Sequence, residues 1–129
     1  MKSKRILKFY FCAQRLNDAL DNLIVHAACS SGREDFWKCA DKVISLISAK
    51  QQLASLWGYL DGVMQGFDEG DRTILRGYAF SRVGYSGLPR DKANRVRRVV
   101  VRFMRRARSL RLYGAGVELV GRYYALLGR

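Results

Sequence analysis

The spacing of apolar residues along this chain predicts helices almost throughout. From about Ser3 to Ala28, apolar positions recur in steps of three and four residues, the period of one helix face. A wider and more strongly apolar stripe covers about Glu34 to Met64, which predicts a long, central second helix. Its largely buried residues are expected to include Trp37, Ile44, Leu56 and Leu60. The end of this helix holds a row of glycines that either admits a neighbouring backbone or loosens the helix, Gly58, Gly62 and Gly66.

Polar and turn-forming residues separate three further helices. Asp68 suits the N-cap of a third helix that ends near Phe80, because its carboxylate can accept from a backbone N–H of the first turn. Segment 81–89 holds two glycines and the single proline, which is typical of a loop. An Arg-rich fourth helix over 90–111 and a last helix over about Ala115 to Leu127 follow. The sequence therefore predicts an all-α protein, a compact bundle of about five helices in one domain, 1–129.

The fourth helix carries most of the charge of the chain. Ten of its residues are Arg or Lys and one is acidic, so it supplies +9 of the net +13. Its apolar residues form one stripe and most of its arginines lie opposite, while Val101 alone points toward the arginine side. Like charges repel at i,i+4 spacing, so a face without interspersed acids is typical of an anion-binding surface. The candidate binding residues are Arg90, Lys92, Asn94, Arg95, Arg97, Arg98, Arg102, Arg105, Arg106 and Arg108.

This face favours a non-enzymatic nucleic-acid-binding protein, a small DNA-binding regulator of transcription. A helix of this length extends ~30 Å, enough to follow several phosphates of a duplex. DNA or RNA would be bound mainly through non-specific phosphate contacts, with Asn94 either reading an adenine or capping the helix start. We expect Arg98, Arg102 and Arg105 to be exposed and free of internal ion pairs, because eleven acids serve twenty-four bases.

Three other interpretations of the same face stay open. An adaptor or subunit could dock an acidic protein surface through these arginines. A basic amphipathic helix can also lie on an anionic membrane, although in so short a chain its apolar side is needed for the core. A charged helix face can, finally, be solvated without binding a partner.

The composition argues against several other classes of protein. No apolar run approaches the ~18 residues of a membrane span, and Lys8 interrupts the apolar stretch 6–13, so we interpret the start as mature protein rather than signal peptide. Three cysteines without a disulfide framework favour a reducing, cytoplasmic compartment. His26, Cys29 and Cys39 could supply three zinc ligands, but ordinary thiols are the preferred interpretation. With one histidine and scattered carboxylates, we expect neither a cofactor nor an enzyme.

Residues 67–78, FDEGDRTILRGY, resemble the first helix of DNA-binding region four of bacterial sigma factors and related phage regulators. That family has an apolar start, an Arg five positions on and then an apolar pair, matched here by Phe67, Arg72, Ile74 and Leu75. A basic helix with a late Ala and Leu follows, as Ala107 and Leu110 do here. The apolar middle helix of the family has no good counterpart in 81–90. The resemblance implies that the later helix enters the major groove and brings near bases or phosphates Arg95, Arg97, Arg98 and Arg102.

Overall fold

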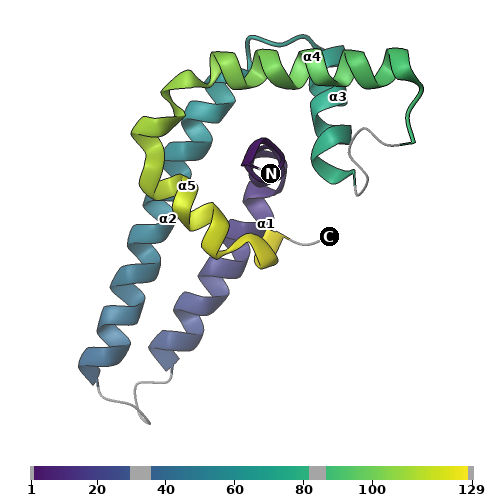
Figure 1. Ribbon diagram of the computed structural model, residues 1–129. Coiled ribbons are helices and arrows are strands. Elements are labelled where there is room, and N and C mark those ends of the chain that lie inside the picture. The colour runs from purple at the N-terminus through teal and green to yellow at the C-terminus, as the bar shows by residue number, and fades with distance from the viewer. Residues whose placement is uncertain (1, 30–35, 82–86, 128–129) are drawn as a thin grey trace.

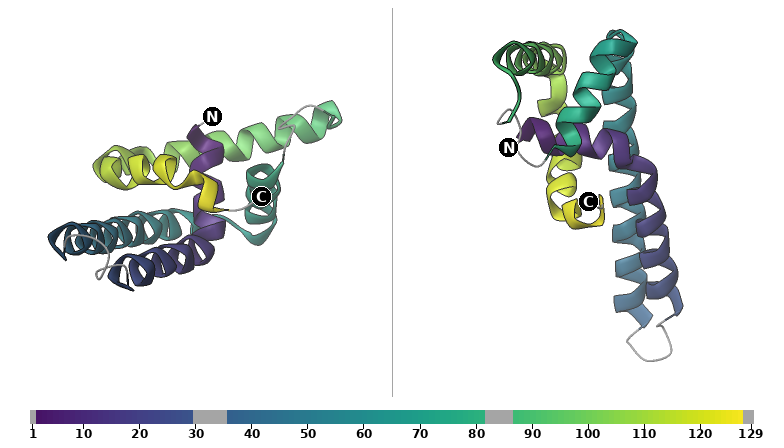
Figure 2. Two further views of the ribbon diagram at one scale, coloured as in Figure 1. Left: turned by 90° about the horizontal axis from the view of Figure 1, so that it is seen from below. Right: turned by 90° about the vertical axis from the view of Figure 1, so that its right-hand side faces the viewer.

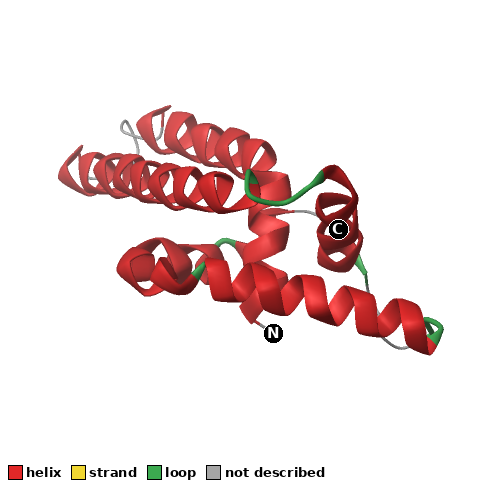
Figure 3. Ribbon diagram, turned by 90° about the horizontal axis from the view of Figure 1, so that it is seen from above, coloured by secondary structure: helices red, strands yellow, loops and turns green. Residues whose placement is uncertain are grey.

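The computed structural model describes residues 2–29, 36–81 and 87–127, and every regular element in these ranges is helical (Figure 1, Figure 3). The predicted all-α bundle of five helices is confirmed for this part of the chain. The elements in order are α1 (Lys2–Cys29), α2 (Phe36–Met64), α3 (Glu69–Phe80), α4 (Arg90–Arg106), the 3-10 helix η1 (Arg108–Tyr113), α5 (Gly114–Arg122) and the 3-10 helix η2 (Tyr124–Leu127).

An antiparallel hairpin of α1 and α2 supports the other elements (Figure 1). α3 and η2 pack against α1, whereas η1 packs against α2, and α5 contacts both helices of the hairpin. The core forms where these elements meet, because each contributes one apolar stripe. Its fully buried large side chains include Phe9, Leu16, Leu20, Leu56, Leu60, Leu75 and Phe103.

The half of the hairpin next to segment 30–35 extends beyond the other helices (Figure 1, Figure 2). In this half the side chains of Trp37 and Ile44 are 72% and 64% exposed, so the prediction that they are buried is wrong. Leu56 and Leu60, in the other half of α2, are 0% exposed, as predicted. The reason for the error is that the wide apolar stripe of α2 covers two faces, and α1 covers one of them.

α1 bends, so that its first turns run at a steep angle to the rest of the helix (Figure 2). The indole Nε1 of Trp57 donates to the backbone carbonyl of Tyr10 across 3.1 Å. A side chain that takes a helix carbonyl as acceptor is a recognised cause of such bends. Near this N-terminal end, Ile6 and Leu7 are both completely buried, although they point in different directions from the helix axis.

The basic helix is shorter than the 22 residues of the predicted range 90–111. α4 ends at Arg106, and Ala107, with φ −88° and ψ 27°, turns the chain into η1. Its 17 residues extend roughly 26 Å rather than ~30 Å. Burial explains the turn, since Ala107 and Leu110 both enter the core where η1 meets α2 and α5. The last predicted helix is divided in the same way, at Tyr123, between α5 and η2.

The glycines of α2 do not form a packing row. A Cβ placed at Gly58 or Gly62 would meet no atom within 4 Å. The close helix approach lies instead at Gly116 of α5, where a Cβ would be 3.1 Å from the Cβ of Leu56 and 3.2 Å from the carbonyl oxygen of Gln52. Gly116 therefore lets α5 pack tightly on α2.

This difference between glycines can be measured. Gly58→Ala should raise the free energy of unfolding by up to ~1 kcal/mol, because Ala loses less backbone entropy in a helix. Gly116→Ala makes the same chemical change but must push Leu56 or the α2 backbone aside, so it should lower that free energy. Urea unfolding of both variants at low protein concentration provides the comparison. An equal rise in the free energy of unfolding in both variants would contradict the close approach at Gly116.

Candidate nucleic-acid interface

α4 lies along one side of the molecule and packs with one face (Figure 3). It contacts α3, α2 and η1, and the side chains that it buries there are Val99, Val100 and Phe103. Val101, on the other side of the helix, is 42% exposed, as its position in the pattern predicts. One face of α4 is thus fixed in the core and the other faces solvent.

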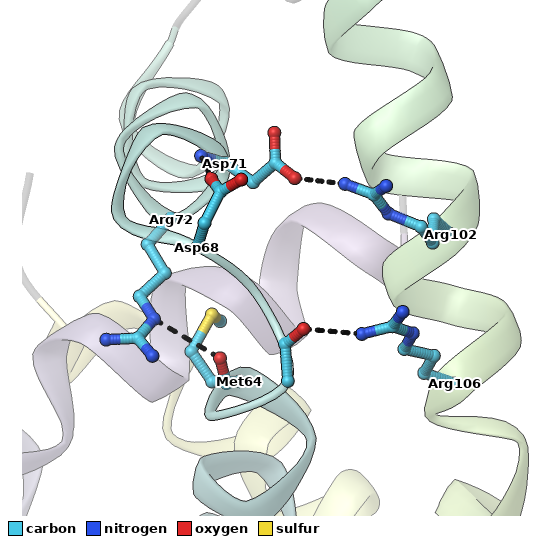
Figure 4. A network of polar contacts seen from close by, with 7 residues as sticks. Met64, Asp68, Asp71, Arg72, Arg102 and Arg106 are labelled. Atoms are coloured by element: carbon cyan, nitrogen blue, oxygen red, sulfur yellow. Dashed lines mark hydrogen bonds and ion pairs between the residues drawn. The ribbon is translucent and has the colours of Figure 1, made fainter.

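Two arginines of α4 bind the turn between α2 and α3 (Figure 4). Arg102 forms an ion pair with Asp71 at the start of α3. Arg106 donates from Nη1 to the carbonyl oxygen of Gly66 across 2.6 Å. Both guanidinium groups also lie over the ring of Phe67, with their central carbons 5.2 Å and 4.8 Å from its centroid. We call Arg102 and Arg106 the anchoring arginines, because these contacts join α4 to the α2–α3 turn.

The local structure of the turn explains why these contacts form. Asp68 is the N-cap of α3 and its carboxylate accepts from the backbone N–H of Asp71 across 2.8 Å, which confirms the predicted cap. The cap fixes Asp71 in the first turn, with its carboxylate toward α4 (Figure 4). At Gly66, a Cβ would lie 2.8 Å from Nη1 of Arg106, so glycine leaves the room that this guanidinium occupies.

The prediction that three arginines are free of internal ion pairs is wrong for Arg102. The acid that pairs with it, Asp71, is 31 residues away in sequence, and the fold brings the two side chains together in spite of the small number of acids in the chain. Arg98 and Arg105 are exposed as predicted, and no carboxylate among the described residues pairs with either.

Four further arginines of α4 are exposed, and we call them the outer arginines: Arg90, Arg95, Arg98 and Arg105. Lys92, Asn94 and Arg97 are also exposed on this helix. Arg108 is exposed too, but it belongs to η1 and so leaves the face of α4. Asn94 does not cap the helix, because α4 begins earlier and its N-cap position is Pro89.

A second feature is a groove of about 470 Å³ between the two helices of the hairpin, with mainly apolar walls. Tyr10 and Trp57 stack at its edge with ring centroids 5.6 Å apart. The hydroxyl of Tyr10 donates to Oδ1 of Asp61 across 2.7 Å. Burial raises the pKa of Tyr10 to about 12, and the hydrogen bond to Asp61 and its negative charge act in the same direction.

Tyr10 should lose its proton only at high pH. The pKa of Tyr10 in the folded chain lies above the value near 10 of an unfolded chain, so the folded state holds the proton more tightly. Its contribution to stability is therefore complete below pH 10 and is lost as the pH rises through about 12. In an ultraviolet titration, Tyr10→Phe should remove an ionisation step at a pH of about 12, and Asp61→Asn should move that step to lower pH. If the ionisation step at high pH is unchanged in Tyr10→Phe, the raised pKa does not belong to Tyr10.

The described residues contain no group of three His, Cys, Asp or Glu side chains that could hold a metal ion. Of the three residues considered for zinc, Cys39 is buried while Cys29 and His26 are exposed. In the described ranges, no helix has both the length and the apolar character needed to cross a bilayer. Comparisons with protein-family models, with curated proteins and with solved structures found no match to this chain.

Proposed function

We propose that this chain is a non-enzymatic nucleic-acid-binding protein, a small DNA-binding regulator, and that it binds through the outer arginines of α4. The observation that carries the proposal is a group of exposed arginines on a helix that buries another face in the core. The net charge of +13 adds a long-range attraction for polyanions. Free cysteines at positions 12, 29 and 39 support a reducing, cytoplasmic location.

The packing of α4 makes its charges act together. The anchoring arginines and the buried valines hold the helix, so Arg98 and Arg105 stay ~10 Å apart along its axis. Charges held at a fixed spacing on one helix can neutralise more than one phosphate in a single encounter. The counterions released from those phosphates then contribute together to the binding free energy.

The resemblance to region four of sigma factors supports DNA over RNA within this proposal. α3 and α4 pack against each other, and Phe67 and Leu75, two of the matched residues, are buried. Of the arginines that the resemblance brings near DNA, Arg95, Arg97 and Arg98 are exposed. Arg102 faces Asp71 instead, so it would have to exchange that carboxylate for a phosphate.

An acidic protein surface is the second candidate partner. The contact between Arg102 and Asp71 favours it, because the same helix already binds a carboxylate there. The two candidates differ in the chemistry of the partner and in the salt dependence that follows from it.

A salt titration of the whole chain tests the proposal. Random-sequence duplex DNA, single-stranded RNA and polyglutamate serve as probes. If four outer arginines contact phosphates of the duplex, the logarithm of affinity should fall against the logarithm of salt with a slope of roughly −3 to −4. Absence of binding to either nucleic acid at low salt would overturn the proposal. Binding to polyglutamate in that case would assign the surface to an acidic protein.

A further inference from the structure

The outer face of α2 carries a second apolar seam. Its residues follow one another in steps of three and four, the spacing of the a and d positions of a coiled coil. We call them the outer seam, Trp37, Ala40, Ile44, Ile47, Gln51, Ala54 and Gly58. All seven are exposed except Ala40, which is half-buried. The seam runs along six turns of the helix, ~30 Å in length.

This seam is separate from the face of α2 that builds the core. The inner face buries Cys39, Leu53 and Leu56, which lie on the opposite side of the helix from Ile44. No helix of the described chain covers Ile44, and the side chains of Ile44 and Trp37 are mostly exposed. A heptad spacing sustained along an exposed face is typical of a helix that pairs with another helix.

Side-chain size changes along the outer seam and indicates which helix fits. The half near segment 30–35 is bulky, with Trp37, Ile44 and Ile47, whereas the far half ends in Ala54 and Gly58. Space is open at Gly58, where a Cβ would meet nothing within 4 Å. A second copy in antiparallel orientation would place each bulky half against a small half. In parallel orientation, tryptophan would meet tryptophan and glycine would meet glycine, which leaves one end crowded and the other empty.

We propose that the occupant of this face is a second copy of the chain, related by a two-fold axis that crosses α2 between Ile44 and Ile47. In this register Ile44 of one copy packs against Ile47 of the other, on both sides of the axis. Trp37 of each copy then lies over Ala54 of the other, beside the open space at Gly58. Such an interface is self-complementary and closed, so it produces a dimer rather than a filament.

The charge distribution permits this association in spite of the net charge of +13. None of the seven seam residues is charged, and the outer arginines lie on α4, at the end of the hairpin away from segment 30–35 (Figure 1). Two helices in contact over this length bury on the order of 1,000 Å², the lower limit for a specific interface. The dimer is therefore expected to dissociate on dilution. The proposal does not depend on nucleic-acid binding, and it is tested without nucleic acid.

Sedimentation equilibrium over a range of protein concentrations tests the dimer. The wild type should change from monomer to dimer as its concentration rises. Ile44→Glu should raise the dissociation constant at least ~100-fold, because the two-fold axis brings the new charge into the interface twice. Leu112→Glu is the matched control, since Leu112 is also a highly exposed apolar residue but belongs to η1 and not to the outer seam. This control should associate like the wild type.

Cysteine cross-linking tests the register. In a Cys29→Ser background, Cys12 and Cys39 are buried, so newly introduced exposed cysteines should dominate the reaction. A mixture of the variants Ile44→Cys and Ile47→Cys should form mainly the mixed disulfide. A parallel pair would instead favour disulfides within each variant.

Three results would overturn the proposal. They are a monomer at every concentration, a dimer that Ile44→Glu leaves intact, and association that continues beyond two copies. A monomer that binds anionic phospholipid vesicles, and loses this binding in Trp37→Ser, would assign the seam to a membrane surface. Circular dichroism of each variant checks that the hairpin is folded. Ile44→Glu should keep the spectrum of the wild type, because the side chain of Ile44 is exposed in the monomer.

Discussion

Replacing Leu60 by Ala should lower the free energy of unfolding by ~2–5 kcal/mol. The side chain of Leu60 is completely buried, in the half of α2 that contacts α1 and α5. Truncation removes apolar contact and leaves a cavity that the helices around it close only in part. For a chain of this size the loss is a large fraction of the total stability, and chemical denaturation followed by circular dichroism measures it.

Ile44→Ala is the matched control, because it makes a similar truncation on the same helix where the side chain is 64% exposed. Its effect on the free energy of unfolding should be within ~0.5 kcal/mol at concentrations where the chain is monomeric. Similar losses in both variants would mean that Ile44 is buried in solution. That result would contradict the exposed half of the hairpin.

Replacing all four outer arginines by Ala should remove most of the salt dependence of duplex binding. Each lost phosphate contact flattens the plot of log affinity against log salt by ~0.9, so the slope should change by roughly 3–4 units. Over a fourfold rise in salt, that change corresponds to a ~100-fold difference in how much affinity is lost. Fluorescence anisotropy with a labelled duplex measures both slopes. The fold should persist, since these side chains are exposed.

A pair of double variants separates local contacts from total charge. Arg98→Ala with Arg105→Ala removes two charges from α4, while Lys38→Ala with Arg122→Ala removes two exposed charges from α2 and α5. The first pair should change the slope by about two units and the second by less than one. Equal changes would show that overall charge, rather than the arginines of α4, determines binding.

The helical fold was predictable because the apolar period was regular in every segment. Burial along α2 was predictable at Leu56 and Leu60 but not at Trp37 and Ile44. An apolar stripe shows that a face avoids water, and it does not show whether a helix of the same chain covers that face. The end of α4 at Ala107 could not be predicted either, because the apolar spacing continues through the turn to Leu110.

For the candidate site, the exposure of Arg98 and Arg105 on the basic helix was predictable from the apolar spacing. The sequence did not distinguish the anchoring arginines from the other arginines of α4, because all are the same residue type on the polar side of one helix. Their roles depend on where the α2–α3 turn lies in space. Asp71 was visible in the sequence as an acid in the first turn of α3, but its pairing with Arg102 required the fold.

The burial of α4 is uneven along its length, and this has a consequence for local opening. Val99, Val100 and Phe103 are buried and the anchoring arginines follow, whereas no residue from Arg90 to Arg98 is fully buried. The first two turns are therefore held mainly by their own backbone hydrogen bonds. Such turns open at a lower free energy than the whole chain unfolds, so their amide hydrogens should exchange well before those around Phe103. If α4 binds an anion as proposed, Arg90, Lys92 and Arg95 can then adjust to its shape, while Arg105 meets it in a fixed position.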